Sequence, residues 1–252
     1  MATRTLHLIF LDDVHAADVL FMQNLSRSMG RRSWRPAPVL VHGSGEHAEQ
    51  LLESHGIFRS RSDGVLAIES SREHALVQQA LRGLNQKVVA LLTDAVVSSV
   101  GVMGSQRSVF AARNGGLFVQ EISWLKDLCE QGVVPVVAAS GRDVASGSTG
   151  EIPAVHAAIV LARALRTWYE RVEVVFFTTT NLPGIMHAGK PREQVSVGDE
   201  VLRDKVPDMD ALLEVVSAGL PVVLTNSNRL SDEAGPSGTM ITAPEAASGM
   251  DA

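Results

Sequence analysis

The chain contains a single cysteine, Cys129, so it cannot form an internal disulfide. Proteins with so few cysteines are typical of the reducing cytosol, and we expect a cytoplasmic location. Positive charge is also in short supply, because 22 lysines and arginines stand against 28 aspartates and glutamates, a formal net charge of −6. A nucleic-acid-binding surface needs an excess of basic residues, so we expect no nucleic-acid partner.

Long apolar runs are missing as well. No stretch reaches the roughly 18 to 20 apolar residues that cross a bilayer, and the N-terminus lacks the apolar core of a secretory signal. We therefore expect no membrane partner. Cysteine and histidine pairs at zinc-site spacing are also absent, so no metal-binding residues are predicted.

The composition is that of a globular protein that builds a core: 45% of the 252 residues are apolar and 20% are charged. Cys129 lies in a stretch with helical spacing, 119–131, and is interpreted as a buried apolar residue rather than a nucleophile. The length fits one large α/β domain or two smaller lobes.

Short β-branched runs alternate with helical segments along the whole chain. The expected strands are 6–11, 38–41, 65–68, 98–102, 109–112, 133–138, 172–178 and 221–225. The expected helices are 16–29, 46–54, 72–93, 119–131, 155–171 and 209–218. Strands separated by helices predict an α/β fold with a mostly parallel sheet, whose ligands bind beyond the carboxyl ends of the strands. Segments 140–150 and 226–238 are expected to be loops.

The most informative segment is 39–57, where an apolar strand, the turn Gly43-Ser44-Gly45 and a helix at 46–54 follow one another. Such a turn directs backbone N–H groups toward one point and can hold a phosphate or a carboxylate. His42 precedes the turn, and either contacts a bound anion or is a hydrogen-bonded structural residue. The histidines His47, His55 and His74 are expected on the surface.

Several motifs occur in the order found in one known family. These are Val-His-Gly-Ser-Gly at 41–45, the turn and hairpin at 99–104 and 110–113, the helix and strand at 119–141, Phe-Thr-Thr-Thr-Asn-Leu-Pro-Gly-Ile-Met at 177–186, and Gly-Thr-Met-Ile at 238–241. Together they resemble the amino acid kinase family, and within it the acetylglutamate kinases most closely. The resemblance implies a three-layer α/β/α sandwich with an acid-binding lobe at about 1–145 and a nucleotide-binding lobe at about 146–242. The tail at 243–252 has little apolar surface to bury, so we expect it to be disordered.

The resemblance also implies a function. In that family ATP phosphorylates a carboxylate; for the acetylglutamate kinases this is the side-chain carboxylate of acetylglutamate, in arginine biosynthesis. The implied partners are an amino acid derivative, a nucleotide with Mg²⁺, and a second copy of the chain. The substrate-binding positions carried over are His42, Gly43, Ser44, Gly45, Gly101 and Gly104. The nucleotide-binding positions carried over are Thr180, Asn181, Leu182, Gly184, Lys190 and Lys205.

The chain departs from the family pattern where cations are required. Phe10 stands at the position of the first lysine, followed by Asp12 and Asp13 in place of glycines. Val155 replaces the aspartate that orients the lysines, and Glu151 replaces an asparagine of the same segment. Losing one charge-stabilising donor typically costs about 10²–10³ in rate, so we expect weak or absent kinase activity.

Further departures concern the substrate and the second lysine. Val65 and Leu66 stand where an arginine is expected near Gly64, and Pro207 or Asp208 stands at the second lysine. No catalytic residue can therefore be assigned. Two hypotheses remain: an acetylglutamate kinase-like enzyme, and an inactive relative that binds a metabolite or a partner.

Two residue pairs keep alternative interpretations. Asp12 and Asp13 either cap the helix that follows or bind a metal or a phosphoryl group. Lys190 and Arg192 either reach nucleotide phosphates or are simply solvated. Ser44 is tolerable even at a left-handed position, where a serine costs about 1 kcal/mol relative to glycine.

Overall fold

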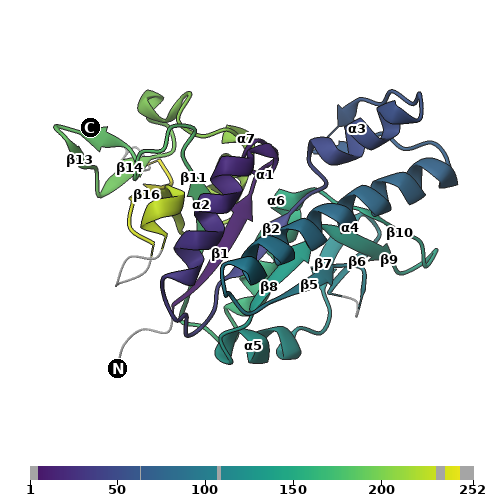
Figure 1. Cartoon of the computed structure of the whole chain (residues 1–252), viewed down its shortest axis with the longest axis horizontal. Coiled ribbons are helices and arrows are strands. Elements are labelled where there is room, and N and C mark those ends of the chain that lie inside the picture. The colour runs from purple at the N-terminus through teal and green to yellow at the C-terminus, as the bar shows by residue number, and fades with distance from the viewer. Residues whose placement is uncertain (1–4, 63, 107–108, 231–235, 245–252) are drawn as a thin grey trace, which may run out of the picture.

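An eight-stranded sheet forms the middle layer of the fold (Figure 1). The computed structural model describes residues 5–62, 64–106, 109–230 and 236–244. In the sheet the strands run in the order β14-β16-β15-β11-β1-β2-β8-β5, and all neighbours are parallel except β15 and β16. The strand bounds are β1 Thr5–Leu11, β2 Val39–His42, β5 Ser99–Met103, β8 Val134–Ala138, β11 Arg171–Phe177, β14 Gln194–Ser196, β15 Val222–Thr225 and β16 Thr239–Thr242.

Helices cover both faces of this sheet. Alternate residues of β1 point to opposite sides, so Leu8 and Phe10 join one apolar core and Ile9 joins the other. The core around Ile9 is closed by the helices α2 (Val19–Gly30) and α4 (Ser71–Asp94), which cross one face of the sheet in Figure 1. The opposite core is closed by α5 (Ser123–Glu130), α6 (Ala154–Leu165) and α7 (Met209–Ser217). The predicted three-layer α/β/α sandwich is confirmed.

Some predicted helices have different ends. The single helix expected at 16–29 is two helices, α1 (Asp13–Ala17) and α2, because the Asp18 side chain accepts hydrogen bonds from the first amides of α2 and starts a new helix. The helix expected at 119–131 begins only at Ser123, because β7 (Gly116–Val119) pairs with β6 (Phe110–Arg113). The helix expected at 155–171 already ends at Leu165.

The segment expected as a loop at 140–150 is largely β-structure. The strands β9 (Ser140–Asp143) and β10 (Thr149–Glu151) pair antiparallel, and together with β6 and β7 they form a second sheet of four strands. The pairing sets Glu151 opposite Ser140. Because β9 follows β8 directly, the end of β10 lies beside the carboxyl ends of the central strands.

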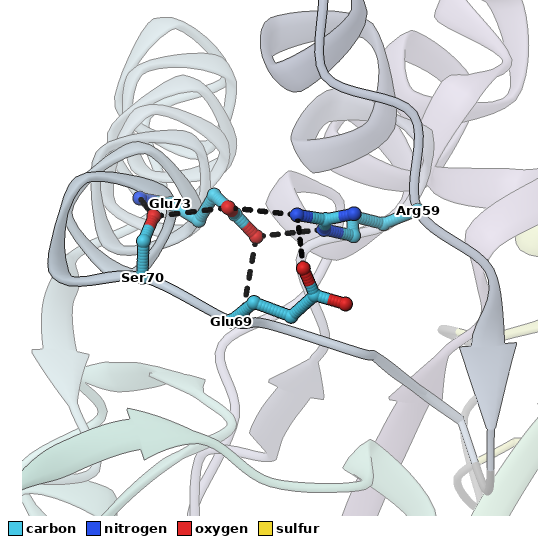
Figure 2. A network of polar contacts seen from close by, with 4 residues as sticks. All are labelled: Arg59, Glu69, Ser70 and Glu73. Atoms are coloured by element: carbon cyan, nitrogen blue, oxygen red, sulfur yellow. Dashed lines mark hydrogen bonds and ion pairs between the residues drawn. The ribbon is translucent and has the colours of Figure 1, made fainter.

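A small unit lies outside the main layers. The helix α3 (Glu46–Ser54) packs on α4 through Ala48 and Leu52, and is followed by a two-stranded hairpin, β3 (Arg61–Ser62) and β4 (Val65–Leu66). Arg59, just before the hairpin, is bound to Glu73 in the first turn of α4 (Figure 2). The hairpin is therefore held against the start of α4 as well as by its own strands.

The remaining elements are short: β12 (Met186–His187), β13 (Lys190–Pro191), and the 3₁₀ turns η2 (Glu200–Leu202) and η3 (Ser227–Arg229). The central sheet takes strands from both halves of the chain, so the proposed acid-binding and nucleotide-binding lobes share it. Within the described ranges, no helix has the length and apolarity needed to cross a membrane. Most of the predicted tail, from residue 245 on, lies outside the described residues.

Candidate functional site

A cavity of about 210 Å³ lies at the carboxyl ends of β1 and β2. Five parts of the chain surround it: the step from β1 into α1, the turn after β2, the β3–β4 hairpin, the segment that leads into α6 and the segment that leads into α7. Its lining residues are Phe10, Leu11, Asp12, Asp13, Val14, Gly43, Arg61, Gly64, Pro153, Ala154, Val155, Pro207 and Asp208. Carboxyl ends of parallel strands are the usual ligand site in such sheets.

A second cavity of about 680 Å³ adjoins the first and shares Gly64, Pro153, Val155 and Asp208 with it. It runs along α7 and adds two further carboxylates, Asp210 and Glu214, and the imidazole of His156. We refer to the two cavities together as the cleft.

Gly43, the first residue of the turn Gly43-Ser44-Gly45, lines the cleft, and Ser44 behind it is fully buried. Gly45 has φ +58° and stands at the N-cap of α3, where no side chain caps the helix. The left-handed conformation thus falls on a glycine and not on Ser44, so the serine brings no backbone strain. The Ser44 amide donates a hydrogen bond of 2.7 Å to Oε1 of Glu151.

Negative charge dominates the cleft. Burial raises the pKa of Asp13, Glu151 and Asp208, against the opposing effect of Arg61 on the first two and of a backbone amide on Asp208. The carboxylates also raise one another's pKa: Asp12 acts on both Asp13 and Asp208. A reaction that brings negatively charged phosphate groups into this cleft would be opposed by repulsion from the carboxylates.

Arg61 is the only lysine or arginine among the described residues that line the cleft. Its guanidinium is already engaged: Nε donates to Glu49, Nη2 donates to the Gly45 carbonyl at 2.6 Å, and Nη1 donates to the Gly64 carbonyl at 3.1 Å. Oδ2 of Asp13 lies 3.8 Å from Nη1 of Arg61. The guanidinium therefore braces the turn and the hairpin and offers little free hydrogen-bonding capacity.

Of the two roles considered for Asp12, the structure shows helix capping. It is the N-cap of α1, and it accepts hydrogen bonds from the His15 amide at 2.9 Å and from the His15 ring at 2.6 Å. In the described part of the chain, no group of three or more histidine, cysteine, aspartate or glutamate side chains is arranged to hold a metal ion. The cleft as built does not fit a triphosphate with Mg²⁺, because its carboxylates are not gathered into a metal site and its single guanidinium is engaged.

His42 takes a structural position. It is fully buried, its Nδ1 hydrogen-bonds the Gly43 carbonyl at 2.7 Å, and Asn85 donates to its Nε2 at 3.0 Å. Burial lowers the pKa of His42 to about 4, so the ring is neutral at pH 7. Of the two interpretations of this residue, the hydrogen-bonded structural one agrees with the contacts.

The other substrate-side glycines divide between two places. Gly43 and Gly45 belong to the turn at the cleft, whereas Gly101 lies in the middle of the edge strand β5, beside an apolar groove formed with Trp124 and Leu128. A Cβ at Gly101 would overlap the Asn85 amide, and a Cβ at Gly104 would overlap the Phe110 ring. Both glycines permit close packing and neither lines the cleft.

None of the nucleotide-side residues lines the cleft. Asn181 lines another cavity of about 260 Å³ beside α1 and α2, which shares Val14 with the cleft, and Gly184 is buried against Thr239. Lys190 is exposed on the β12–β13 hairpin, while Lys205 is half-buried and its carbonyl accepts from the Thr179 amide at 2.9 Å. Thr180 and Leu182 are exposed in the segment between β11 and β12. A nucleotide-binding role for these residues stays a prediction.

Two residues of the site were not assigned a role from the sequence. Arg61 reaches the turn from the hairpin, three positions before Gly64, whereas the arginine of the family pattern was expected after that glycine. Glu151 was noted only as a departure from the family pattern, although its carboxylate contacts the turn. In the sequence each is a charged residue two or three positions before a glycine or a proline. This pattern does not indicate where the side chain points.

A comparison with protein families agrees with the fold described above. The model of the amino acid kinase family matches residues 23–194. The chain belongs to the amino acid kinase family. Among curated members, it is 29% identical over 206 residues to the acetylglutamate kinase of Wolinella succinogenes, covering 73% of this chain and 69% of that protein. The acetylglutamate kinase of a Roseiflexus species is 26% identical over 224 residues, covering 81% of each.

Solved structures show the same fold at lower identity. The Streptococcus mutans protein smu.665 matches with a TM-score of 0.65 and 21% identity, over 95% of this chain and 99% of that one. N-acetylglutamate synthase of Neisseria gonorrhoeae, complexed with coenzyme A and N-acetyl-glutamate, matches with a TM-score of 0.64 and 18% identity, over 96% of this chain and 60% of that one. These likenesses concern the fold alone.

For this amino acid kinase family member, four of the departures noted in the sequence lie together in space. Phe10, Val155, Pro207 and Asp208, from three distant parts of the chain, all line the cavity beside Gly43. These four departures are therefore gathered at one place in the fold, whereas Val65 and Leu66 do not line the cavity.

Proposed function

We propose that this protein is a catalytically inactive relative of acetylglutamate kinase, which binds a metabolite in the cleft without phosphorylating it and serves a regulatory or partner role. One observation supports this above the others. The positions assigned to the lysine and its aspartate partner are occupied by Phe10 and Val155, and these two side chains line the same cavity.

Phosphoryl transfer depends on positioning and on cations that stabilise the charge of the moving group. Phe10 cannot supply such a charge, because its side chain is uncharged. The residue is 3% exposed, and its ring packs on Phe176 with ring centroids 5.0 Å apart. Its side chain belongs to the core between the sheet and α6. The remaining cation, Arg61, is held by Glu49 and two backbone carbonyls.

The cleft itself is kept. Two adjoining cavities of about 210 and 680 Å³ hold space for a small metabolite, and their walls combine backbone groups, carboxylates and apolar side chains. Retained space together with missing cations supports binding without transfer.

A second candidate is ATP-dependent phosphorylation of the acetylglutamate side-chain carboxylate in arginine biosynthesis, with Mg²⁺ and a homodimer. The matches to proteins named acetylglutamate kinase favour it. This candidate requires that the lysines outside the cleft, Lys190 or Lys205, come to the turn when ligands bind.

Thermal unfolding of the purified protein with single ligands tests the proposal. We expect stabilisation by acetylglutamate or by arginine, and none by Mg-ATP, because a ligand that binds only the folded state raises its melting temperature. Larger stabilisation by Mg-ATP and acetylglutamate together than by either alone would contradict the proposal, since it would show both substrates bound at once.

A pair of variants places the binding site. Val155 lines both cavities, so Val155→Trp should abolish the stabilisation by the amino acid ligand. Val19 is 54% exposed on α2 and lines neither cavity, so Val19→Trp is the matched control and should keep it. Equal stabilisation of both variants would place the ligand elsewhere.

A further inference from the structure

The turn after β2 already holds a carboxylate that belongs to the chain itself. The Ser44 amide donates to Oε1 of Glu151 at 2.7 Å, from a residue 107 positions later in the sequence. A Cβ placed on Gly43 would lie 3.7 Å from the same oxygen. Glu151 therefore contacts the small-residue turn that the sequence predicts to bind an external phosphate or carboxylate.

Backbone hydrogen bonds fix Glu151 in this position. The Ala139 amide donates to the His42 carbonyl at 2.8 Å, and the Ile152 amide donates to the Ala139 carbonyl at 3.0 Å. The residue before the turn and the residue after Glu151 are thus both tied to Ala139. The carboxylate is brought to the turn by the sheet and not only by the rotamer of a long side chain.

A second carboxylate also lies close to the turn. Oδ1 of Asp13 lies 3.8 Å from the Cβ position of Gly43 and 3.5 Å from that of Gly45. Asp13 comes from the first turn of α1 and lines the cavity. An anion that entered the turn would meet negative charge from both Glu151 and Asp13.

We propose that Glu151 is an internal occupant of the Gly43–Gly45 turn, which takes the place of an external carboxylate or phosphate and makes the turn select against an anionic group of the ligand. The proposal rests on the cleft being the ligand site, as proposed above, and it adds the charge class of the ligand: neutral or cationic at the end that faces the turn. Acetylglutamate, if it binds, must then direct its carboxylates away from Ser44.

The contacts of the Glu151 carboxyl group indicate that a substitution can remove it from the turn. Its Oε2 is buried without a hydrogen-bond partner, and burial raises the pKa of the carboxyl. Arg61 is the nearby cation that opposes this rise, and Asp13 adds to it. A carboxylate held mainly by one amide should be removable without loss of the fold.

Inorganic phosphate is the probe for the test, and the ¹⁵N-labelled protein reports on the Ser44 amide by NMR. We expect phosphate to leave the Ser44 amide of the unmodified protein unshifted, and to shift it in Glu151→Ala. Two unit charges about 4 Å apart interact strongly enough near a protein surface that removing one should tighten phosphate binding at least about tenfold.

Two further variants complete the test. Glu170→Ala removes one exposed carboxylate outside the cleft and should leave phosphate binding unchanged, which controls for net charge. Glu151→Gln keeps an oxygen that can accept the Ser44 hydrogen bond but removes the charge, so it should gain less than Glu151→Ala and more than the control. If Glu151→Ala does not fold, the gain of Glu151→Gln over the control decides the outcome.

Equal phosphate affinity of Glu151→Ala and Glu170→Ala would overturn the proposal, as would a phosphate-induced shift of Ser44 in the unmodified protein. The result is independent of kinase activity. Turnover of acetylglutamate by the unmodified protein would end the proposed function and leave the phosphate comparison intact, so the two failures can be told apart.

Discussion

The Arg59 guanidinium makes two hydrogen bonds to the carboxylate of Glu73, from Nε to Oε2 at 2.8 Å and from Nη2 to Oε1 at 3.0 Å (Figure 2). The Ser70 hydroxyl and the Glu69 amide donate to the same carboxylate. This network fixes the chain just before the β3–β4 hairpin, and the hairpin carries Arg61 and Gly64 to the cleft. The shape of the site therefore depends on contacts made outside it.

The Arg59–Glu73 pair predicts a pH-dependent loss of stability. The hydrogen bonds from Arg59 hold the pKa of Glu73 at about 2, below the ordinary value of 4.5. A depressed carboxyl pKa contributes stability that is present above pH 4.5 and is lost as the pH falls toward 2. Glu73→Gln should lower the melting temperature at pH 7, and the difference from the unmodified protein should shrink over this window.

Glu69→Gln is the matched control for that experiment. Its carboxylate also contacts Arg59, at 2.7 Å, but its side chain is 71% exposed, so solvent screens the interaction. We expect a much smaller effect on the melting temperature. Equal effects of the two substitutions at pH 7 would contradict the role given to Glu73.

The crowded carboxylates of the cleft predict the opposite sign for Asp13. Burial raises its pKa above the ordinary 3.8, so the folded protein loses stability as the pH rises through the raised value and the group becomes charged. Asp13→Asn should raise the melting temperature at pH 7 and have little effect below pH 3.8. The rise should be at most about 2–4 °C, which roughly 1 kcal/mol produces in a chain of this size, since the side chain is 46% exposed.

Asp204→Asn provides the comparison for Asp13, because Asp204 is exposed and lies outside the cleft. We expect no pH-dependent gain from it. Differential scanning fluorimetry between pH 3.5 and 8 measures both variants, and a fall in melting temperature for Asp13→Asn at pH 7 would show that Arg61 outweighs the burial of this carboxylate.

The central layer of the fold was predictable because its strands carry their own signal. Uninterrupted apolar runs such as 133–138 indicate strands buried on both faces, and β8 (Val134–Ala138) is fully buried. In the second sheet β6 was predicted, at 109–112, but β9 and β10 escaped prediction, since they consist of glycine, serine, threonine and charged residues. Those strands are held by pairing with each other and with β6, a tertiary effect that local propensity does not contain.

Gly101 is expected to tolerate no side chain. Asn85 packs where a Cβ would lie, and its amide joins His42 to the Val136 carbonyl, at 3.0 and 2.9 Å. Gly101→Ala should therefore destabilise the protein by about 1–3 kcal/mol, as overpacking usually does. Denaturant unfolding measures the change.

Gly83→Ala gives a control of opposite sign. Gly83 lies inside α4 with nothing near its Cβ position, so alanine there should stabilise the protein by about 0.5–1 kcal/mol. Stabilisation by Gly101→Ala would mean that the Asn85 side chain can move away without loss, and that His42 does not depend on it.

Cys129 should be unreactive in the folded protein. The thiol is fully buried on α5, and burial raises its pKa to about 12, so almost no thiolate exists at pH 8. A thiol reagent such as dithionitrobenzoate should label it only after unfolding. Fast labelling of the native protein at pH 8 would show that α5 opens or that the thiol reaches solvent.

The site was predictable in its place but not in its contacts. The strand, the turn at 43–45 and the helix that follows marked the cleft, and the departures at Phe10 and Val155 marked what it lacks. The engagement of Glu151 with Ser44, and of Arg61 with the Gly45 carbonyl, could not be read from spacing. Each joins residues that only the folded sheet and hairpin bring together.

Acyl phosphate formation decides whether phosphoryl transfer survives without cations at the turn. The measurement traps any acyl phosphate made from acetylglutamate and Mg-ATP with hydroxylamine, and compares the hydroxamate formed with that of a sample lacking the protein. We predict equal amounts in both samples, because Phe10 and Val155 leave the transferred group without positive charge. Hydroxamate formation at about one turnover per second, within the ordinary range of enzymes, would contradict the absence of catalysis.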